Sequence, residues 1–270
     1  MTIRQWVIIV LASVSVIVLY NLPRSVVDND SQSAIIDSKV STAEALHSFE
    51  LPIESKARVR SLQNLIVETS DKKKCAIFAD SLATIYLLYN YLDSAEAYAD
   101  QILDFDSDYE SQVRAGEIFF QLYGVSADLV KTKNYASKAA ICFETALIEE
   151  KNPDLESKLA MTKVVTSNPM EGIMMLRKVL EEYPENKTAL YSMGVLSMQS
   201  GQYEKAVERF EKLMVIDKTN DQAAYYLAVS YFETGNNIKS QEWFEKIKTL
   251  SGDPAILEST DQYLKKLNEL

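Results

Sequence analysis

The chain of 270 residues is 47% hydrophobic and carries a formal net charge of −11, from 28 basic and 39 acidic side chains. This excess of acid excludes a protein that tracks a nucleic-acid backbone, because that role needs clustered Lys and Arg to displace counterions. Only 7 Gly and 6 Pro occur, a composition that favours an all-helical chain with short turns over a disordered or all-β chain.

The first predicted element is a membrane-spanning helix over residues 6–22, after a tail of residues 1–5. This run of 17 residues carries no charge, which is at the lower limit for a hydrocarbon core about 30 Å thick. Trp6 and Tyr20 stand near its ends, where membrane helices carry aromatic belts. We therefore expect a single-pass membrane anchor.

A cleavable signal peptide is the alternative reading of the same segment. Ser13-Val14-Ser15 has the small-x-small form of a cleavage site, but it lies inside the apolar run, so we favour an uncleaved anchor. Arg4 and Arg24 flank the run and leave the orientation nearly balanced. A short leading segment before one span usually keeps the N-terminus inside, so we expect the rest of the chain outside the cytoplasm.

A polar, acidic juxtamembrane linker is predicted for residues 23–41, followed by an N-terminal helical segment over residues 42–75. Within it, residues 52–69 should form a helix that caps the array. Its expected apolar side consists of Ile53, Ala57, Leu62, Leu65 and Ile66. The basic run Asp71-Lys72-Lys73-Lys74 is interpreted as a solvated helix start.

A repeat of 34 residues dominates residues 153–252. In the clearest unit, Gly201 marks a turn, and Ala206, Phe210 and Leu213 follow at helical spacings of four and three. Equivalent small and large residues recur one period on either side: Ser167, Gly172, Leu176 and Val179 before, and Gly235, Ser240, Phe244 and Ile247 after. Large-then-small pairs recur in the preceding helices: Leu159-Ala160, Met193-Gly194 and Leu227-Ala228. The period predicts three stacked helical hairpins.

These motifs resemble the tetratricopeptide repeat (TPR) family, whose best match is residues 187–220. Departures from its pattern are Leu190 for tryptophan, Ser197 for tyrosine and Lys218 for proline. The resemblance implies an all-α fold, a right-handed superhelical array of antiparallel helix hairpins. With its predicted anchor, the chain resembles membrane-anchored bacterial TPR proteins. Together with the expected orientation, this implies a bacterial inner membrane and a periplasmic C-terminal domain.

Two degenerate TPR-like repeats precede the clear ones, over residues 76–152. The second fits only if about eleven extra residues are allowed around residues 124–134, which we expect to interrupt the array as a longer loop. After Gly252-Asp253-Pro254, residues 253–270 should form a C-terminal capping helix whose charged face shields the last repeat.

The family resemblance also implies a concave groove lined by the first helix of each repeat. Carried over to the three best repeats, its positions are Ser157, Met161, Val164 and Val165, then Tyr191, Val195, Met198 and Gln199, then Tyr225, Val229, Phe232 and Glu233. The predicted partner-binding residues among these are Met161, Val165, Tyr191, Val195, Met198, Tyr225, Val229 and Phe232. Met and Tyr suit an apolar helix or extended peptide. The alternative is that these residues belong to the core of a tight or self-filled array.

The same positions exclude the carboxylate clamp that some family members use for chaperone C-termini, since Ser157, Tyr191 and Tyr225 replace its charged donors. Catalytic, metal and cofactor sites are not expected either. His47 is the single histidine, and Cys75 and Cys142 are expected to be buried thiols.

We therefore expect a non-enzymatic, membrane-anchored scaffold for protein–protein interaction that binds a peptide or helix of a partner. It would serve in assembly or quality control of envelope complexes. The alternative is a structural subunit of a homo- or hetero-oligomeric membrane complex, with its groove permanently filled.

Overall fold

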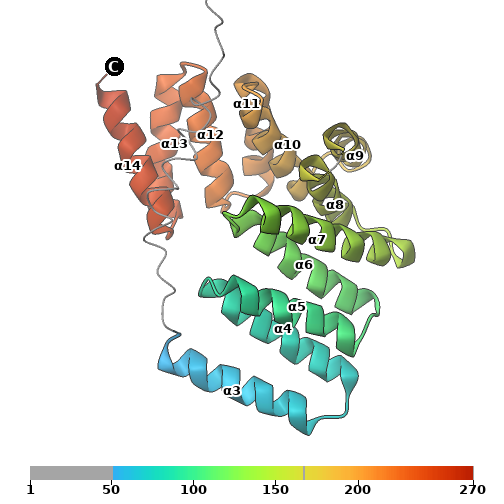
Figure 1. The fold of residues 1–270 in the computed structure, drawn as a ribbon. Coiled ribbons are helices and arrows are strands. Elements are labelled where there is room, and N and C mark those ends of the chain that lie inside the picture. Colours follow the sequence, from blue (N-terminus) through green and yellow to red (C-terminus); the bar gives the residue numbers. More distant parts are fainter. Residues whose placement is uncertain (1–50, 167, 270) are drawn as a thin grey trace, which may run out of the picture. The chain divides into compact units, whose positions relative to one another are not determined.

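The computed structural model describes residues 51–166 and 168–269, and these residues form twelve α-helices and no β-strand (Figure 1). Helices α3 (Ile53–Glu68) and α14 (Pro254–Asn268) are single, and the other ten form five hairpins. The hairpins are α4 (Lys72–Leu88) with α5 (Leu92–Phe105), α6 (Tyr109–Val125) with α7 (Leu129–Glu149), α8 (Pro153–Val165) with α9 (Pro169–Glu182), α10 (Lys187–Gln199) with α11 (Tyr203–Ile216), and α12 (Asp221–Glu233) with α13 (Asn237–Leu250). The predicted all-α repeat solenoid is confirmed.

The predicted anchor, the juxtamembrane linker and His47 lie outside the described residues. Among residues 51–166 and 168–269, no helix combines the length and the hydrophobicity that a membrane span requires.

Short polar side chains start most of these helices. Nine of the twelve described helices have an Asp or Asn N-cap whose side chain accepts a hydrogen bond from a backbone N–H of the first turn. Such a cap stabilises a helix by about 1 kcal/mol relative to alanine. Asn168, directly before Pro169, is one of them, and its side chain accepts from the Glu171 N–H. The sequence thus sets the start of these nine helices locally.

Three hairpin turns share one backbone conformation. Gly201 and Gly235 have φ values of 69° and 74°, in the left-handed region that favours glycine. Asn90 has a φ of 61° in the α4–α5 turn, and asparagine is one of the few other residues that tolerate this region. In each turn, the N–H of the next residue bonds a carbonyl five residues back, as in Gln202 to Ser197 at 2.8 Å. The first hairpin therefore has the turn of the clear repeats without their glycine.

Glycines on the first helices make room for phenylalanines on the second helices. A Cβ added to Gly194 would lie 2.6 Å from ring atoms of Phe210, and one added to Gly116 would lie 2.7 Å from the ring of Phe143. Both rings are fully buried. The large-then-small pairs of the sequence are therefore contact points within hairpins.

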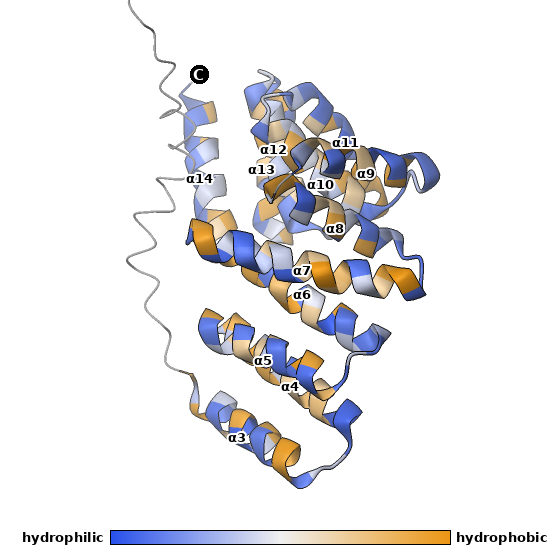
Figure 2. Ribbon diagram, turned by 45° about the vertical axis from the view of Figure 1, so that its right-hand side comes forward, coloured by the Kyte–Doolittle hydropathy of each residue, from blue (hydrophilic) through white to orange (hydrophobic). Residues whose placement is uncertain are grey.

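The core runs along the array and is narrowest at α8–α10. One cluster of buried side chains spans α4 to the middle of α8, and another spans α10 to α14. Between them lies a small cluster of Ala160, Leu176, Val179, Ala189 and Met193. Half-buried Met175 and Leu180 connect this small cluster to the larger ones. Figure 2 shows hydrophobic and hydrophilic turns interspersed along the helices.

The longer loop predicted at residues 124–134 is wrong. Helix α6 continues to Val125 and α7 begins at Leu129, so the extra residues lengthen two helices to 17 and 21 residues. The reason is local: the Asp128 carboxylate accepts from the backbone N–H groups of Val130 and Lys131 and starts α7 early. The array is not interrupted here.

The predicted cap helix forms as α3, and its predicted apolar side is confirmed only in part. Leu62 and Ile66 are half-buried on the same side as buried Val59, whereas Ile53, Ala57 and Leu65 are exposed. The packed side is set by contact with α4 and by hydrogen bonds that hydropathy does not reveal. The interpretation of residues 71–74 as a solvated helix start is confirmed, because Asp71 caps α4 and Lys72 is exposed.

Candidate functional site

The first helices of the hairpins pack on one another along the array. Helix α4 packs on α6, α8 on α10, α10 on α12, and α12 on α14. We call the surface formed by α4, α6, α8, α10, α12 and α14 the first-helix face. All eight predicted partner-binding residues lie on three of these helices, α8, α10 and α12.

Tyr191 on α10 is held by both its ring and its hydroxyl. The hydroxyl donates to Oε1 of Gln222 on α12 at 3.0 Å. The ring centroid lies 6.3 Å from that of Phe210 in an edge arrangement and 6.0 Å from that of Tyr226. Burial, together with Tyr226, raises the pKa of Tyr191. Tyr191 is therefore a fixed, neutral ring that joins two repeats.

Tyr225 on α12 repeats this arrangement against α14. Its hydroxyl lies 2.5 Å from Oγ of Ser259, and its ring contacts those of Tyr226, Phe244 and Tyr263. Phe232 meets Tyr263 edge-on at 5.2 Å. Burial raises the pKa of Tyr263 to about 12. Helix α14 thus extends the first-helix face with an aromatic residue that sequence reasoning did not assign to it.

The predicted groove residues on α8 differ from one another in burial and in their contacts. Met161 is half-buried and packs on the small central cluster, and Val165 is half-buried at the last position of α8. Val164 instead packs against α9, since its Cγ2 would lie only 2.7 Å from a Cβ atom added to Gly172. Ser157 is fully buried and donates to the Pro153 carbonyl at 2.7 Å. These last two side chains serve packing within the array.

Most of the predicted partner-binding residues keep part of their surface exposed. Val229 is buried at 7% exposure. The other seven are half-buried: Met161, Val165, Tyr191, Val195, Met198, Tyr225 and Phe232. Gln199 and Glu233 are exposed beside them. The first-helix face therefore exposes apolar surface on α10 and α12, and contacts with neighbouring helices hold Tyr191 and Tyr225 in place.

The N-terminal part of the same face is charged. Nη1 of Arg114 on α6 lies 3.2 Å from Oδ2 of Asp80 on α4. Burial raises the pKa of Asp80, against the opposing effect of the Arg114 guanidinium. Lys158 on α8 pairs in the same way with Glu117 on α6. Sequence reasoning missed these pairs, although the 34-residue separation of Asp80 and Arg114 equals the repeat period and was a usable signal.

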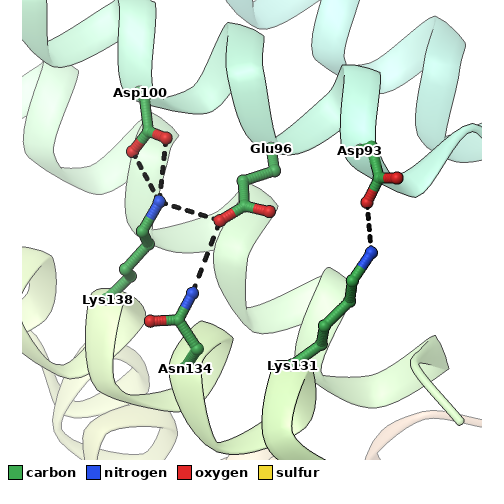
Figure 3. A network of polar contacts seen from close by, with 6 residues as sticks. All are labelled: Asp93, Glu96, Asp100, Lys131, Asn134 and Lys138. Carbon is green, nitrogen blue, oxygen red and sulfur yellow. Dashed lines mark hydrogen bonds and ion pairs between the residues drawn. The ribbon is translucent and has the colours of Figure 1, made fainter. Parts of the chain in front are cut away.

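A second set of charges joins the second helices α5 and α7 (Figure 3). Nζ of Lys138 donates to Glu96 at 2.9 Å and to Asp100 at 2.8 Å, and Lys131 pairs with Asp93. Asp93, Glu96 and Asp100 on α5 are three and four residues apart, as are Lys131, Asn134 and Lys138 on α7, so these side chains meet in register. These carboxylates of α5 thus form contacts between neighbouring hairpins.

The described residues contain little reactive chemistry. In residues 51–166 and 168–269, no three His, Cys, Asp or Glu side chains lie together as metal ligands would. Cys75 and Cys142 are free and buried, as predicted. Burial raises the pKa of the Cys142 thiol to about 11, so it stays protonated at neutral pH.

Comparison with solved structures defines the class of fold. A tetratricopeptide repeat protein from Parabacteroides merdae is 17% identical with a TM-score of 0.55, over 88% of this chain and 89% of that protein. PilF of Pseudomonas aeruginosa is 16% identical with a TM-score of 0.51, over 73% of this chain and 86% of that protein. The described part of the chain has the tetratricopeptide repeat fold, and the family resemblance of its motifs is confirmed.

Sequence comparison adds one curated relative. Surface lipoprotein assembly modifier 1 of Neisseria meningitidis serogroup B is 29% identical over 121 residues, which are 44% of this chain and 25% of that protein. The chain therefore spans about a quarter of the length of this relative. No protein-family model matches the chain.

Proposed function

We propose that this chain is a non-enzymatic scaffold that binds an apolar helix or extended segment of a partner protein on its first-helix face. The binding site is formed by α10 and α12, with Met161 and Val165 of α8 at one end. Tyr191, Val195, Met198, Tyr225, Val229 and Phe232 make the contact.

One observation carries this proposal: the aromatic residues of α10 and α12 are fixed yet remain partly exposed. The Tyr191 and Tyr225 hydroxyls are engaged by Gln222 and Ser259 on the following first helix. Their rings are therefore held in place before any partner arrives, and a preorganised site loses less side-chain entropy on binding. The adjacent half-buried Met198 adapts its shape to apolar side chains.

We further propose that the scaffold acts in the cell envelope, with residues 6–22 as its membrane anchor and residues 23–41 as its linker. The hydrophobicity of residues 6–22 supports the anchor. The name of the curated relative, a surface lipoprotein assembly modifier, supports a role in assembly of envelope components. The partner in this proposal is an envelope protein.

Photo-crosslinking in native cells tests the binding surface. A photoreactive amino acid replaces Met198 on α10 or, as the control, exposed Val215 on α11. We expect one envelope protein to be crosslinked from position 198 and not from position 215. Equal crosslinking from both positions, or crosslinking of the chain only to itself, would contradict the proposal, and the second result would support a structural subunit with a filled groove.

Protease treatment of spheroplasts tests the location. A tag follows Leu270, and its removal is compared before and after lysis. We expect the tag to be removed from intact spheroplasts. A tag that survives until lysis would place the repeats in the cytoplasm and redirect the search for the partner.

A further inference from the structure

Helix α11 carries a half-buried arginine that has no acidic partner. Nη1 of Arg209 donates to the Met193 carbonyl of α10 at 3.0 Å and also to Oγ of Ser197. Both acceptors are uncharged. A guanidinium has five N–H donors, and those on Nε and Nη2 of Arg209 have no partner within the described part of the chain. Partial burial of a cation without a counterion is unfavourable.

Arg177 on α9 adds a second cation beside the first. It is exposed and forms no hydrogen bond or ion pair with any described residue. Burial and the charge of Arg177 both lower the pKa of Arg209, against the opposing charge of Glu208. Helices α9 and α11 both pack on α10 (Figure 1). Two like charges therefore lie close to each other between α9 and α11.

The neighbouring acidic side chains do not neutralise this pair. Glu208 is the one described carboxylate whose charge acts on Arg209, and it is itself paired with Lys212 at 2.8 Å. Glu181 lies one turn from Arg177 on α9, but it is exposed and forms no ion pair within residues 51–166 and 168–269. The two guanidinium groups are therefore left without a bound carboxylate.

The equivalent positions one repeat later show how close these side chains lie. Arg177 corresponds to Glu211 and Ser197 corresponds to Tyr231, each 34 residues on. The Tyr231 hydroxyl donates to the Glu211 carboxylate. The same register brings Arg177 towards Ser197, the residue to which Arg209 is bonded.

The later junction also shows what the α9–α11 junction lacks. There Glu211 provides a carboxylate, and Nζ of Lys239 lies 3.4 Å from it. Between α5 and α7, the carboxylate of Glu96 likewise accepts from Lys138 at 2.9 Å. Arg177 stands where Glu211 stands one repeat later, so the α9–α11 junction holds two cations in place of opposite charges. A bound anion would supply the missing negative charge.

We propose that Arg177 and Arg209 form a binding site for an oxyanion, a phosphate or a carboxylate group, between α9 and α11. A guanidinium suits such a group because its planar fork offers parallel N–H donors to two oxygens. The Met193 carbonyl and Ser197 hold Nη1 of Arg209 and leave its other donors available. Both arginines belong to second helices, so the inference does not rest on the proposed partner-binding surface.

Full-length chain in a mild nonionic detergent tests the site, with inorganic phosphate and acetate as the probes. Sodium chloride at the same ionic strength is the reference, because any salt screens like charges. The Nε–H resonances of the arginine side chains report binding in NMR spectra, and thermal unfolding reports stabilisation. Arg177→Gln removes one of the two cations. Arg60→Gln is the matched control, since Arg60 is an exposed arginine on α3.

We expect phosphate or acetate, and not chloride, to shift the Arg177 and Arg209 resonances to a saturating value and to leave that of Arg60 in place. The saturating anion should raise the Tm of the wild-type and Arg60→Gln chains by at least about 2 °C more than that of Arg177→Gln. A response to phosphate alone identifies a phosphate ligand, whereas a response to acetate shows that a carboxylate group suffices.

Equal stabilisation of the wild-type and Arg177→Gln chains would overturn the site, because general salt effects act on both chains alike. Resonance shifts as large in chloride as in phosphate and acetate would overturn it as well. Without added anion, Arg177→Gln should not lower the Tm, since it removes a repulsion; a lower Tm would mean that Arg177 has a partner within the chain and would overturn the site.

Arg209→Lys is the second variant, because it keeps the charge and removes the fork. We expect it to weaken binding of the responding anion about fivefold or more. Wild-type affinity in a folded Arg209→Lys chain would overturn the assignment of Arg209 to the site.

Discussion

The hydroxyl of Tyr225 lies 2.5 Å from Oγ of Ser259, 34 positions later in the chain. The repeat period of the sequence is thus realised as a side-chain contact between successive first helices. The same separation joins Arg114 to Asp80 and Thr188 to Asp154, the latter at 2.8 Å. Neighbouring repeats are therefore linked by polar contacts on the face that also carries the candidate site.

Removing the Ser259 hydroxyl should weaken the junction of α12 with α14. Ser259→Ala leaves the half-buried Tyr225 hydroxyl without this partner, and we expect a loss of about 0.5–1.5 kcal/mol in the free energy of unfolding. Urea denaturation measures it. Ser81→Ala is the matched control, because Ser81 is bonded only within its own helix, to the Ile77 carbonyl. An equal loss in both variants would show that the inter-repeat bond does not contribute.

The positive φ of Gly201 gives a second prediction. Gly201→Ala places a side chain in the left-handed region and should destabilise the α10–α11 turn by roughly 1–2 kcal/mol. Gly252→Ala is the control, because Gly252 has open space around its Cβ position and no positive φ. Thermal unfolding should show a lower Tm for Gly201→Ala alone. Identical Tm values would rule out strain at the turn.

The contact of Gly194 with Phe210 predicts opposite effects for two helical glycines. Gly194→Ala forces the new Cβ against a fully buried ring, and overpacking of this kind costs about 1–3 kcal/mol. Gly124→Ala has nothing within 4 Å of its Cβ position, so it should stabilise α6 by up to about 1 kcal/mol through helix propensity. Denaturant unfolding tests both signs. Stabilisation by Gly194→Ala would mean that α10 and α11 are less closely packed than described.

The Cys142 thiol predicts a loss of stability at alkaline pH. Burial raises its folded-state pKa to about 11, whereas an unfolded thiol ionises near about 8.5. Between these values the unfolded state has lost a proton that the folded state retains, so the free energy of unfolding falls as pH rises through this window. Cys142→Ala should flatten that part of the pH profile. A profile unchanged by the substitution would contradict the burial of this thiol.

Thiol reactivity checks the same prediction independently. Neither Cys75 nor Cys142 should react with a thiol reagent in the native protein at neutral pH, and both should react in denaturant. Rapid reaction of either thiol in the native state would show that its helix opens readily.

Much of the fold could be predicted because the relevant signals are local. Gly201 and Gly235 mark turns through their backbone conformation, and both turns are confirmed. The extra residues near Asp128 were assigned to a loop because the repeat pattern fixes register and not helix length. The Asp128 carboxylate caps α7, and these residues are therefore helical.

The candidate site was harder to predict because it depends on which helices become neighbours. Residues Val164 and Tyr191 both occupy groove positions of the repeat, yet Val164 packs on α9 while Tyr191 joins α10 to α12. The charged pairs on α4 and α6, and those on α5 and α7, form only when two hairpins stack in register. The family pattern gives the position of a residue within its repeat, but it does not say which neighbouring helix the side chain contacts.

The most direct test of the proposed scaffold compares two identical substitutions. Val195 is half-buried on the first-helix face of α10, and Val215 is 75% exposed on the second helix α11. The partner identified by crosslinking is titrated against full-length wild-type, Val195→Asp and Val215→Asp chains, with thermal unfolding to show that each is folded. Met198→Ala, which adds no charge, provides a second variant on the same face.

We predict that Val195→Asp raises the Kd roughly tenfold or more, because it places a carboxylate in an apolar contact, and that Met198→Ala raises it by a smaller factor. Val215→Asp should leave the Kd unchanged. Equal Kd values for folded Val195→Asp and wild-type chains would contradict the account, since the partner would then bind elsewhere on the array.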